Sequence, residues 1–236
     1  MYHSIKKEEI ETFQRQLEKI RNRCRAIQFD DLDNPYNGKR RVLVTFDDGF
    51  RNFLENALPA LQSRNIPAVL FIATGYLGKL PGWIEDGWEY SNEPLLERNQ
   101  VAILPKKLVK VGSHTITHPH LDRIPACQLR WELEVSKSEL ERIVGAPVDM
   151  LSFPFGSFNN DVIRSAKEIG YRKLFTNVPV KGFWVGENEL FGRLSVSPGD
   201  WSIEFFFKIS GGYDWLADAI PLKRRIVEIF INNNRN

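Results

Sequence analysis

The stretch VLVTFDDGFRN, residues 42–52, joins a strand to a pair of carboxylates. Its apolar and β-branched start predicts a buried strand over residues 41–46, and Asp47 and Asp48 follow directly. Adjacent carboxylates raise the cost of ionising each other. Such a pair is typical of a turn, where Asp and Gly are common. Alternatively, one carboxylate binds a divalent cation, which lets its neighbour stay ionised as a base.

The composition indicates one globular domain over residues 1–236. Its 42% of hydrophobic residues is enough for a substantial core, and the net charge of +2 does not indicate nucleic-acid binding. The first residues contain no apolar leader, and no run of about 18 apolar residues occurs. We therefore expect a cytoplasmic protein without a membrane span. Cys24 and Cys127 are far apart, so we expect free thiols rather than a disulfide.

Strand-like segments alternate with amphipathic segments along the chain. The predicted strands are residues 41–46, 68–73, 109–112, 148–153 and 173–176. The predicted helices are residues 5–25, 52–65, 125–144, 160–170 and 221–231. Residues 75–107 and most of the chain after residue 178 give no regular pattern. The alternation predicts an α/β fold with parallel strands, and in a (β/α) barrel the polar clusters that follow the strands would meet at one end.

A second polar cluster, SHTITHPH, follows the strand predicted at residues 109–112. His114 and His118 are four residues apart, so one turn of helix would place both imidazoles on one side. Two imidazoles and one carboxylate suit zinc and related metals and leave positions open for water and substrate. Three of the four histidines lie within seven residues, which argues against isolated core or surface histidines.

A third cluster, SFPFG at residues 152–156, follows the strand predicted at residues 148–153. A turn formed by Pro and Gly is the simpler interpretation. The stretch could instead form one wall of a groove, with backbone groups that stabilise an oxyanion. For the tryptophans, core packing is favoured over stacking on sugar rings. These candidates are Trp83, Trp88, Trp184, Trp201 and Trp215.

Together, TFDDG (45–49), SHTITH (113–118) and SFPFG (152–156) resemble the first three motifs of the polysaccharide deacetylases of carbohydrate esterase family 4. The resemblance covers residues 1–176. It implies a deformed (β/α) barrel of the polysaccharide deacetylase type and one divalent metal ion, zinc in the first place and cobalt or nickel otherwise. The implied metal ligands are Asp48, His114 and His118.

The resemblance also implies roles for other residues. Asp47 would be the general base that activates the attacking water. Pro154, Phe155 and Gly156 would bind the substrate, and a backbone N–H near Phe155 would help the metal to hold the oxyanion.

Three departures from the family pattern affect the site. Ser152 stands where many members have an arginine that orients the catalytic aspartate; Arg193 could supply this group, or it could be a plain surface arginine. The late L-x-H motif, which carries an acid histidine, is absent, and His3 in MYHSI could take a role in the site. Asp200 and Trp201 are either a remnant of a D-x-x-D-W motif or, as we favour, a turn and a core tryptophan.

The leading hypothesis is a metal-dependent hydrolase that removes the N-acetyl group from an N-acetylated sugar, oligosaccharide or glycan precursor. One alternative is the same centre acting on a non-sugar amide or a cyclic imide. Another is a weakly catalytic glycan-binding module, which the missing acid histidine and the missing arginine at residue 152 favour. The complete set of metal ligands with Asp47 argues against the module, because a binding protein has no need of a base.

Overall fold

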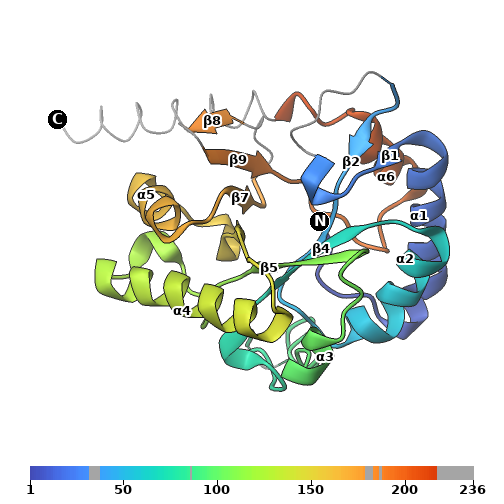
Figure 1. Ribbon diagram of the computed structural model, residues 1–236. Helices are drawn as coiled ribbons and strands as arrows, with labels where there is room; N and C mark the ends of the chain where they lie inside the picture. Colours follow the sequence, from blue (N-terminus) through green and yellow to red (C-terminus); the bar gives the residue numbers. More distant parts are fainter. Residues whose placement is uncertain (32–37, 86, 179–182, 186–187, 217–236) are drawn as a thin grey trace.

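The computed structural model describes residues 1–31, 38–85, 87–178, 183–185 and 188–216 (Figure 1). Seven strands form a curled central sheet in the order β3-β4-β5-β6-β7-β9-β8. All neighbours in it are parallel except β8, which runs antiparallel to β9. Its strands are β3 (Val44–Phe46), β4 (Ala68–Ile72), β5 (Val109–Ser113), β6 (Met150–Ser152), β7 (Lys173–Thr176), β8 (Phe183–Val185) and β9 (Asn188–Gly192). A separate parallel pair consists of β1 (Arg25–Ala26) and β2 (Arg41–Val42).

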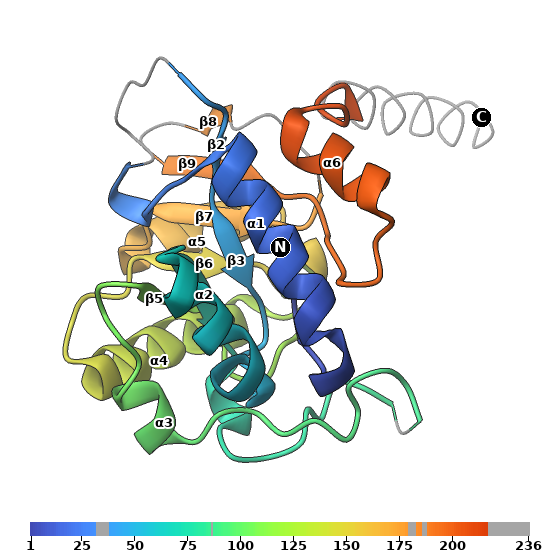
Figure 2. The ribbon, with the colours of Figure 1, turned by 90° about the vertical axis from the view of Figure 1, so that its right-hand side faces the viewer.

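Helices cover the outside of the sheet. Figure 1 shows α1 and α2 on one side and α4 and α5 on the other, and Figure 2 shows α6 beside α1. The helices are α1 (Ile10–Arg23), α2 (Leu58–Arg64), α3 (Arg98–Ala102), α4 (Ala126–Val144), α5 (Asn160–Ile169) and α6 (Ser202–Ser210). A parallel curled sheet flanked by helices is the arrangement expected of a deformed (β/α) barrel, so the predicted fold class is confirmed.

Strand β4 shows why the core forms as it does. Its sequence AVLFI is apolar at every position, as is typical of a parallel strand that is buried on both faces. Leu70 and Ile72 face the cluster beneath α1 and α2, while Val69 and Phe71 face the interior of the curled sheet. Side chains on the two faces of β4 therefore belong to two different hydrophobic clusters.

The N-terminal segment lies between β3 and the chain that follows β9. The Tyr2 N–H donates to the Thr45 carbonyl oxygen (2.8 Å), and the Asp47 N–H donates to the Tyr2 carbonyl oxygen (3.0 Å). On the other side, the Val196 N–H donates to the Met1 carbonyl oxygen (2.8 Å). These bonds bridge the open edge of the half-barrel and bring the first residues to the end of β3.

The structure differs from the predicted elements in several places. The strand predicted at residues 41–46 is interrupted at Leu43, because its two halves pair with different partners, β1 and β4. The helix predicted at residues 52–65 begins with a π-helical turn, Phe53–Ala57, ahead of α2. Pro59 explains this turn, since it has no N–H and its ring clashes with the carbonyl four residues earlier.

Other differences concern segments without a clear sequence pattern. The sequence did not predict α3, β8, β9 or α6. The helix predicted at residues 221–231 lies outside the described residues. In the described part of the chain no helix is long and apolar enough to cross a membrane. Cys24 is buried and Cys127 is exposed, and both are free thiols, as predicted.

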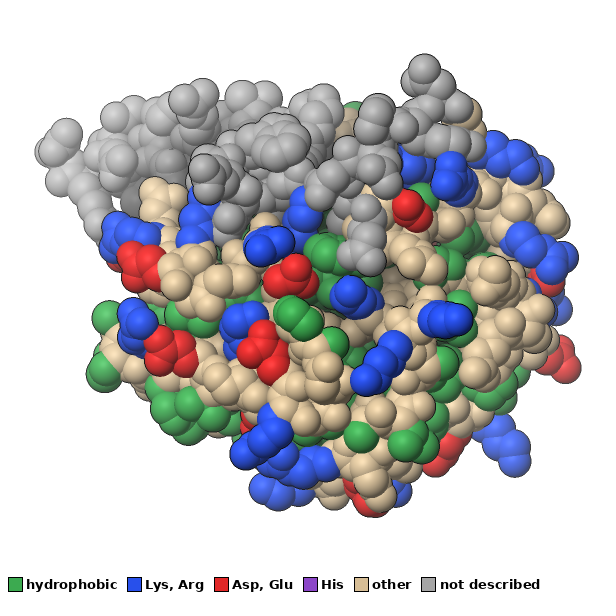
Figure 3. All heavy atoms as spheres, viewed as in Figure 1, with side chains coloured by type: hydrophobic (Ala, Val, Ile, Leu, Met, Phe, Trp, Pro, Cys, Tyr) green, Lys and Arg blue, Asp and Glu red, His purple; other side chains and the backbone are tan. Residues whose placement is uncertain are grey.

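Figure 3 shows how the charged side chains of the described residues are distributed on one face of the molecule. Basic and acidic side chains are interspersed there among polar and hydrophobic ones. This distribution agrees with the near-neutral net charge of +2.

Gly112 in β5 offers a test of the packing inside the sheet. A Cβ at this position would lie 2.5 Å from two ring atoms of Phe71, which is fully buried and cannot move aside. We expect Gly112→Ala to lower the free energy of unfolding by about 1–3 kcal/mol, measured by urea denaturation. Gly199→Ala is the control, because the nearest atom that a Cβ there would meet among the described residues is Ser197 Oγ, at an ordinary contact distance of 3.5 Å. Equal stability of the two variants would contradict this account of the core.

Candidate active site

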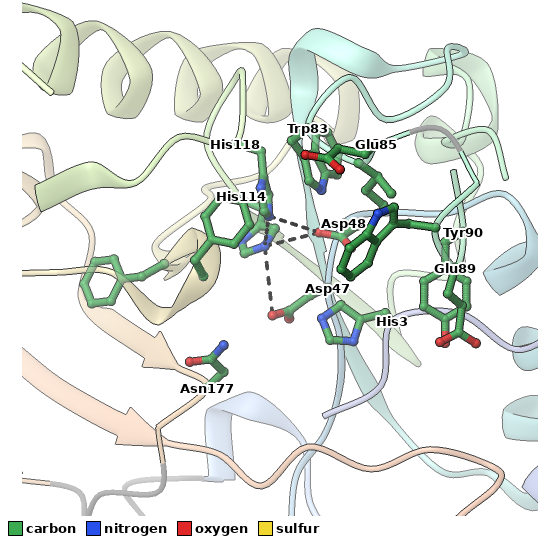
Figure 4. A pocket seen from close by; sticks show the side chains of 14 residues that line it. His3, Asp47, Asp48, Trp83, Glu85, Glu89, Tyr90, His114, His118 and Asn177 are labelled. Atoms are coloured by element: carbon green, nitrogen blue, oxygen red, sulfur yellow. Dashed lines mark hydrogen bonds and ion pairs between the residues drawn. The ribbon is translucent and has the colours of Figure 1, made fainter. Parts of the chain in front are cut away.

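A cavity of about 450 Å³ lies where the carboxyl ends of the central strands meet (Figure 4). Asp47 and Asp48 follow β3, His114 follows β5, Phe153 and Phe155 follow β6, and Asn177 follows β7. His3 comes from the N-terminal segment, and the loop between β4 and α3 contributes aromatic and acidic side chains. These loop residues are Trp83, Ile84, Glu85, Trp88, Glu89 and Tyr90. The cavity has the size and the mixed lining of a ligand site.

Asp48, His114 and His118 form a compact buried triad (Figure 4). Asp48 Oδ1 lies 3.4 Å from His114 Nε2 and 3.3 Å from His118 Nε2, and the two Nε2 atoms are 3.2 Å apart. Asp48 Oδ1 accepts no well-directed hydrogen bond from any described residue, although it is buried. A buried acceptor without a donor is costly. Two imidazoles and a carboxylate that face one another within 4.8 Å therefore fit a divalent cation.

The backbone around the triad differs from the predicted turn of helix. Residues 114–120 are not helical, and Thr115 and His118 have left-handed φ values of 68° and 59°. The sequence-based argument for the shared direction of the two imidazoles was therefore wrong, because a loop rather than a helix brings the rings together.

Glu132 of α4 holds this loop. Its carboxylate accepts hydrogen bonds from the Ile116 N–H (2.7 Å), the Thr117 N–H (2.9 Å) and the Thr117 hydroxyl. Glu132 is completely buried. It was missed in the sequence, although a charged residue next to Leu133 on the apolar face of a predicted helix was a usable signal.

Asp47 is held by a different set of contacts. Arg193 Nη1 donates to Asp47 Oδ1 (2.6 Å) and Arg193 Nη2 donates to Asp47 Oδ2 (2.7 Å). The Ser152 hydroxyl donates to Asp47 Oδ2 (3.1 Å) and accepts from Arg193 Nη2 (2.7 Å). Arg193 is only 8% exposed, so it is not a surface arginine. Ser152, with its small side chain, and Arg193 thus occupy adjacent positions around one carboxylate.

The surroundings shift the pKa values of these groups. Burial opposes the ionisation of Asp47, but the charges of Arg193 and His114 and the hydrogen bonds from Arg193 outweigh it and lower its pKa to about 2. Burial also opposes the ionisation of Asp48, and the adjacent imidazoles still lower its pKa below the usual range. The pKa of His114 is raised because Asp48 and Asp47 outweigh burial, whereas burial lowers the pKa of His118.

His3 lies beside Asp47 at the edge of the cavity (Figure 4). The hydrogen bonds of Tyr2 along β3 place it there. Of the SFPFG stretch, Phe155 lines the cavity, while the buried Pro154 and Gly156 are not among its lining residues. Phe155 has a left-handed φ of 56°, and a Cβ on Gly156 would collide with the Asn177 side chain.

The favoured core packing of the tryptophans is wrong for three of them. Trp88, Trp201 and Trp215 are 69%, 79% and 60% exposed. Trp83 and Trp88 line the cavity, and the side chain of Trp184 lies outside the described residues. Asp200 pairs with Lys208 (2.7 Å), and neither Asp200 nor Trp201 lines the cavity.

Comparison with known proteins agrees with this geometry. Residues 34–174 match the family model described as polysaccharide deacetylase. The chain is 28% identical over 136 residues to a chitooligosaccharide deacetylase of a Bradyrhizobium strain, covering 57% of this chain and 54% of that protein. It is 27% identical over 147 residues to a poly-beta-1,6-N-acetyl-D-glucosamine N-deacetylase of Staphylococcus epidermidis, covering 58% of this chain and 48% of that protein. The chain spans about half the length of the curated relatives it matches.

Solved structures share the fold. The deacetylase PplD of Streptococcus pyogenes, in complex with acetate, superposes with a TM-score of 0.74 at 20% identity, over 89% of this chain and 96% of that one. IcaB from Ammonifex degensii superposes with a TM-score of 0.68 at 21% identity, over 84% of this chain and 88% of that one.

The role of Glu132 in holding the loop gives a testable expectation. Glu132→Ala removes the acceptor of the buried Ile116 N–H and of the partly buried Thr117 N–H, and a buried N–H left without an acceptor costs about 1–3 kcal/mol. We expect the free energy of unfolding in urea to fall by about 2–5 kcal/mol. Glu134→Ala on the same helix is the control, because the Glu134 side chain is 44% exposed and, within the described part of the chain, forms an ion pair only with Arg130. A Glu132→Ala variant as stable as this control would contradict the role of Glu132 in holding the loop of residues 114–120.

Proposed function

Because the chain belongs to the polysaccharide deacetylase family, we propose that it hydrolyses the N-acetyl group of an N-acetylated carbohydrate in this cavity. The products are acetate and a free amine on the sugar. One observation carries the proposal: Arg193 holds Asp47 through two hydrogen bonds at the side of the Asp48–His114–His118 triad.

The triad would hold one divalent cation, zinc in the first place and cobalt or nickel otherwise. This cation would supply Lewis-acid polarisation of the amide carbonyl and of water. The protein fixes His114 for this task, since its Nδ1 donates to the Ser152 carbonyl oxygen (2.7 Å) and leaves the Nε2 lone pair facing Asp48.

Asp47 is the proposed general base. A carboxylate can accept hydrogen bonds at about four lone-pair positions, two on each oxygen. The hydrogen bond from Arg193 Nη1 occupies one position on Oδ1, and those from Arg193 Nη2 and Ser152 occupy both positions on Oδ2. No described residue donates to the remaining position on Oδ1, so this position can accept a proton from the attacking water. Arg193 and Ser152 act as positioning residues, because they fix the direction in which this oxygen points.

His3 is the proposed donor of the proton that the leaving amine requires. When the C–N bond breaks, the amine nitrogen must gain a proton, and His3 is the one histidine outside the triad that lines the cavity. His120 stacks on Phe155 (ring centroids 4.1 Å apart) and is not among the lining residues.

The lining of the cavity favours a sugar substrate. Trp83, Trp88, Tyr90 and Phe155 present aromatic surface around the charged centre. Aromatic rings with a polar centre suit the apolar faces and polar edges of a hexosamine. A glycan-binding module has no use for a buried ion pair that costs desolvation energy at its centre, so we favour catalysis. The single domain over residues 1–236 and the cytoplasmic location stay predictions.

The proposed function is tested by bound metal and acetate release together. The purified protein is loaded with zinc, and acetate is measured with N-acetylated oligosaccharides, single N-acetyl sugars, nucleotide sugars, a simple acetamide and a cyclic imide. Stoichiometric zinc with acetate release from the sugars would support the proposal. Turnover of only the non-sugar amide or the imide would show that the substrate is not a sugar. Bound zinc without turnover of any of these compounds would favour a binding role.

Asp47→Asn is expected to keep zinc and lose turnover. The amide cannot accept the proton, and general-base catalysis contributes about 10²–10⁴-fold to a rate. Acetate release and zinc content are measured at a temperature where circular dichroism shows the variant folded, since Arg193 loses its partner. Asp214→Asn, at an exposed residue paired with Arg40, is the matched control. A rate of acetate release by Asp47→Asn within about threefold of the wild-type rate would show that Asp47 is not the general base.

His3→Ala is expected to lower kcat about 10²-fold or more while zinc content stays unchanged. A donor acts on the leaving amine in the transition state, so KM should change little. Initial rates across substrate concentrations separate the two parameters. A kcat of His3→Ala equal to that of the wild-type protein would show that His3 takes no part in the reaction.

A further inference from the structure

The two histidines of the triad are held in different ways. A hydrogen bond to the Ser152 carbonyl oxygen fixes the His114 ring and its protonated nitrogen. His118 Nδ1 is buried and has no hydrogen-bond partner among the described residues. Metal-binding histidines almost always use this second nitrogen for an orienting hydrogen bond. Some other contact must therefore orient His118.

Aromatic rings surround the His118 imidazole instead. The Trp83 indole stacks on it, with centroids 4.3 Å apart and planes at 18°. The Phe155 ring meets it edge-on at 4.5 Å and 76°. Stacking restricts the tilt of a flat ring, so Trp83 supplies the constraint that the missing hydrogen bond would give.

Trp83 is itself anchored to the protein. Its ring meets Tyr76 edge-on at 5.0 Å, and it packs against the buried cluster of Phe50, Ala73 and Leu95. Ala73 directly follows β4, so the indole is tied to the central sheet. A fixed indole can fix the imidazole that lies on it.

The backbone of His118 gives less support. Its φ of 59° is in the left-handed region, which is unfavourable for a residue with a side chain. Among the described residues, the His118 N–H bonds only to the Thr115 hydroxyl (3.2 Å). The direction of the ring therefore depends strongly on packing.

We propose that Trp83 is a positioning residue of the metal site, which holds His118 Nε2 toward Asp48 and His114. No described residue of the loop that carries Trp83 belongs to the triad, yet on this account Trp83 sets the metal affinity. The inference rests on the proposed function only in taking the triad as a metal site.

The test measures zinc affinity by competition with a chromogenic chelator, independently of any turnover. Trp83→Ala should raise the zinc Kd about 10–100-fold, which is the usual effect of removing a group that orients a ligand. Trp83→Phe should recover most of the affinity, because a phenyl ring keeps a stacking face. With cobalt in place of zinc, the visible absorption bands should change in Trp83→Ala and return toward wild type in Trp83→Phe.

Controls separate this role from general damage to the loop. Leu80→Ala changes an exposed residue (51%) on the same loop and should leave the zinc Kd unchanged. His118→Ala should lose zinc. Trp83→Leu keeps apolar bulk without a flat face, so it serves as the test variant if Trp83→Ala does not fold.

The outcomes are distinct. A zinc Kd in folded Trp83→Ala or Trp83→Leu equal to wild type would overturn the role of Trp83 and leave the triad standing. Failure of the wild-type protein to bind zinc, cobalt or nickel would overturn the metal site and this inference with it. A raised Kd restored by Trp83→Phe would support the proposal.

Discussion

The site depends on the buried ion pair between Asp47 and Arg193. Removing two charges from water costs several kcal/mol per ion, and only good geometry with further hydrogen bonds offsets this. The pair has both: two parallel N–H···O contacts, and additional bonds from Arg193 to the Thr45 hydroxyl (3.2 Å) and the Thr176 carbonyl oxygen (3.3 Å). Ser152 takes part without filling the space that the guanidinium needs. Loss of either partner would leave a buried charge at the centre of the sheet.

The adjacent carboxylates tolerate each other because the backbone sends them into different surroundings. Asp48 has a φ of 71°, in the left-handed region that Asp tolerates better than most residues. Its side chain faces the two imidazoles, while that of Asp47 faces Arg193. Each carboxylate therefore has its own set of partners, and this division suits one ligand and one base.

The sequence predicted the parts of the fold and site that local pattern determines. The strands from β3 to β7 were visible as apolar runs, and the polar residues after them could be placed at one end because parallel strands share a direction. The strands β8 and β9 were not predicted, since short strands depend on pairing with distant partners. Glu132 and Trp83 were not assigned to the site for the same reason: their contacts cross the fold. Arg193 could be named as a candidate, but only tertiary structure brings it to Asp47.

The long separation of Arg193 from Asp47 along the chain has a consequence for synthesis. It lies 146 residues after Asp47, a distance that a ribosome covers in roughly 7–30 s. During that time the carboxylate has no guanidinium partner and would be costly to bury, so the interior of the half-barrel should stay hydrated. The triad of Asp48, His114 and His118 is complete much earlier in the chain. A nascent chain that ends before Arg193 would thus carry all three proposed metal ligands while its proposed base is still unoriented, which delays the proposed hydrolysis until Arg193 has been synthesised and has reached Asp47.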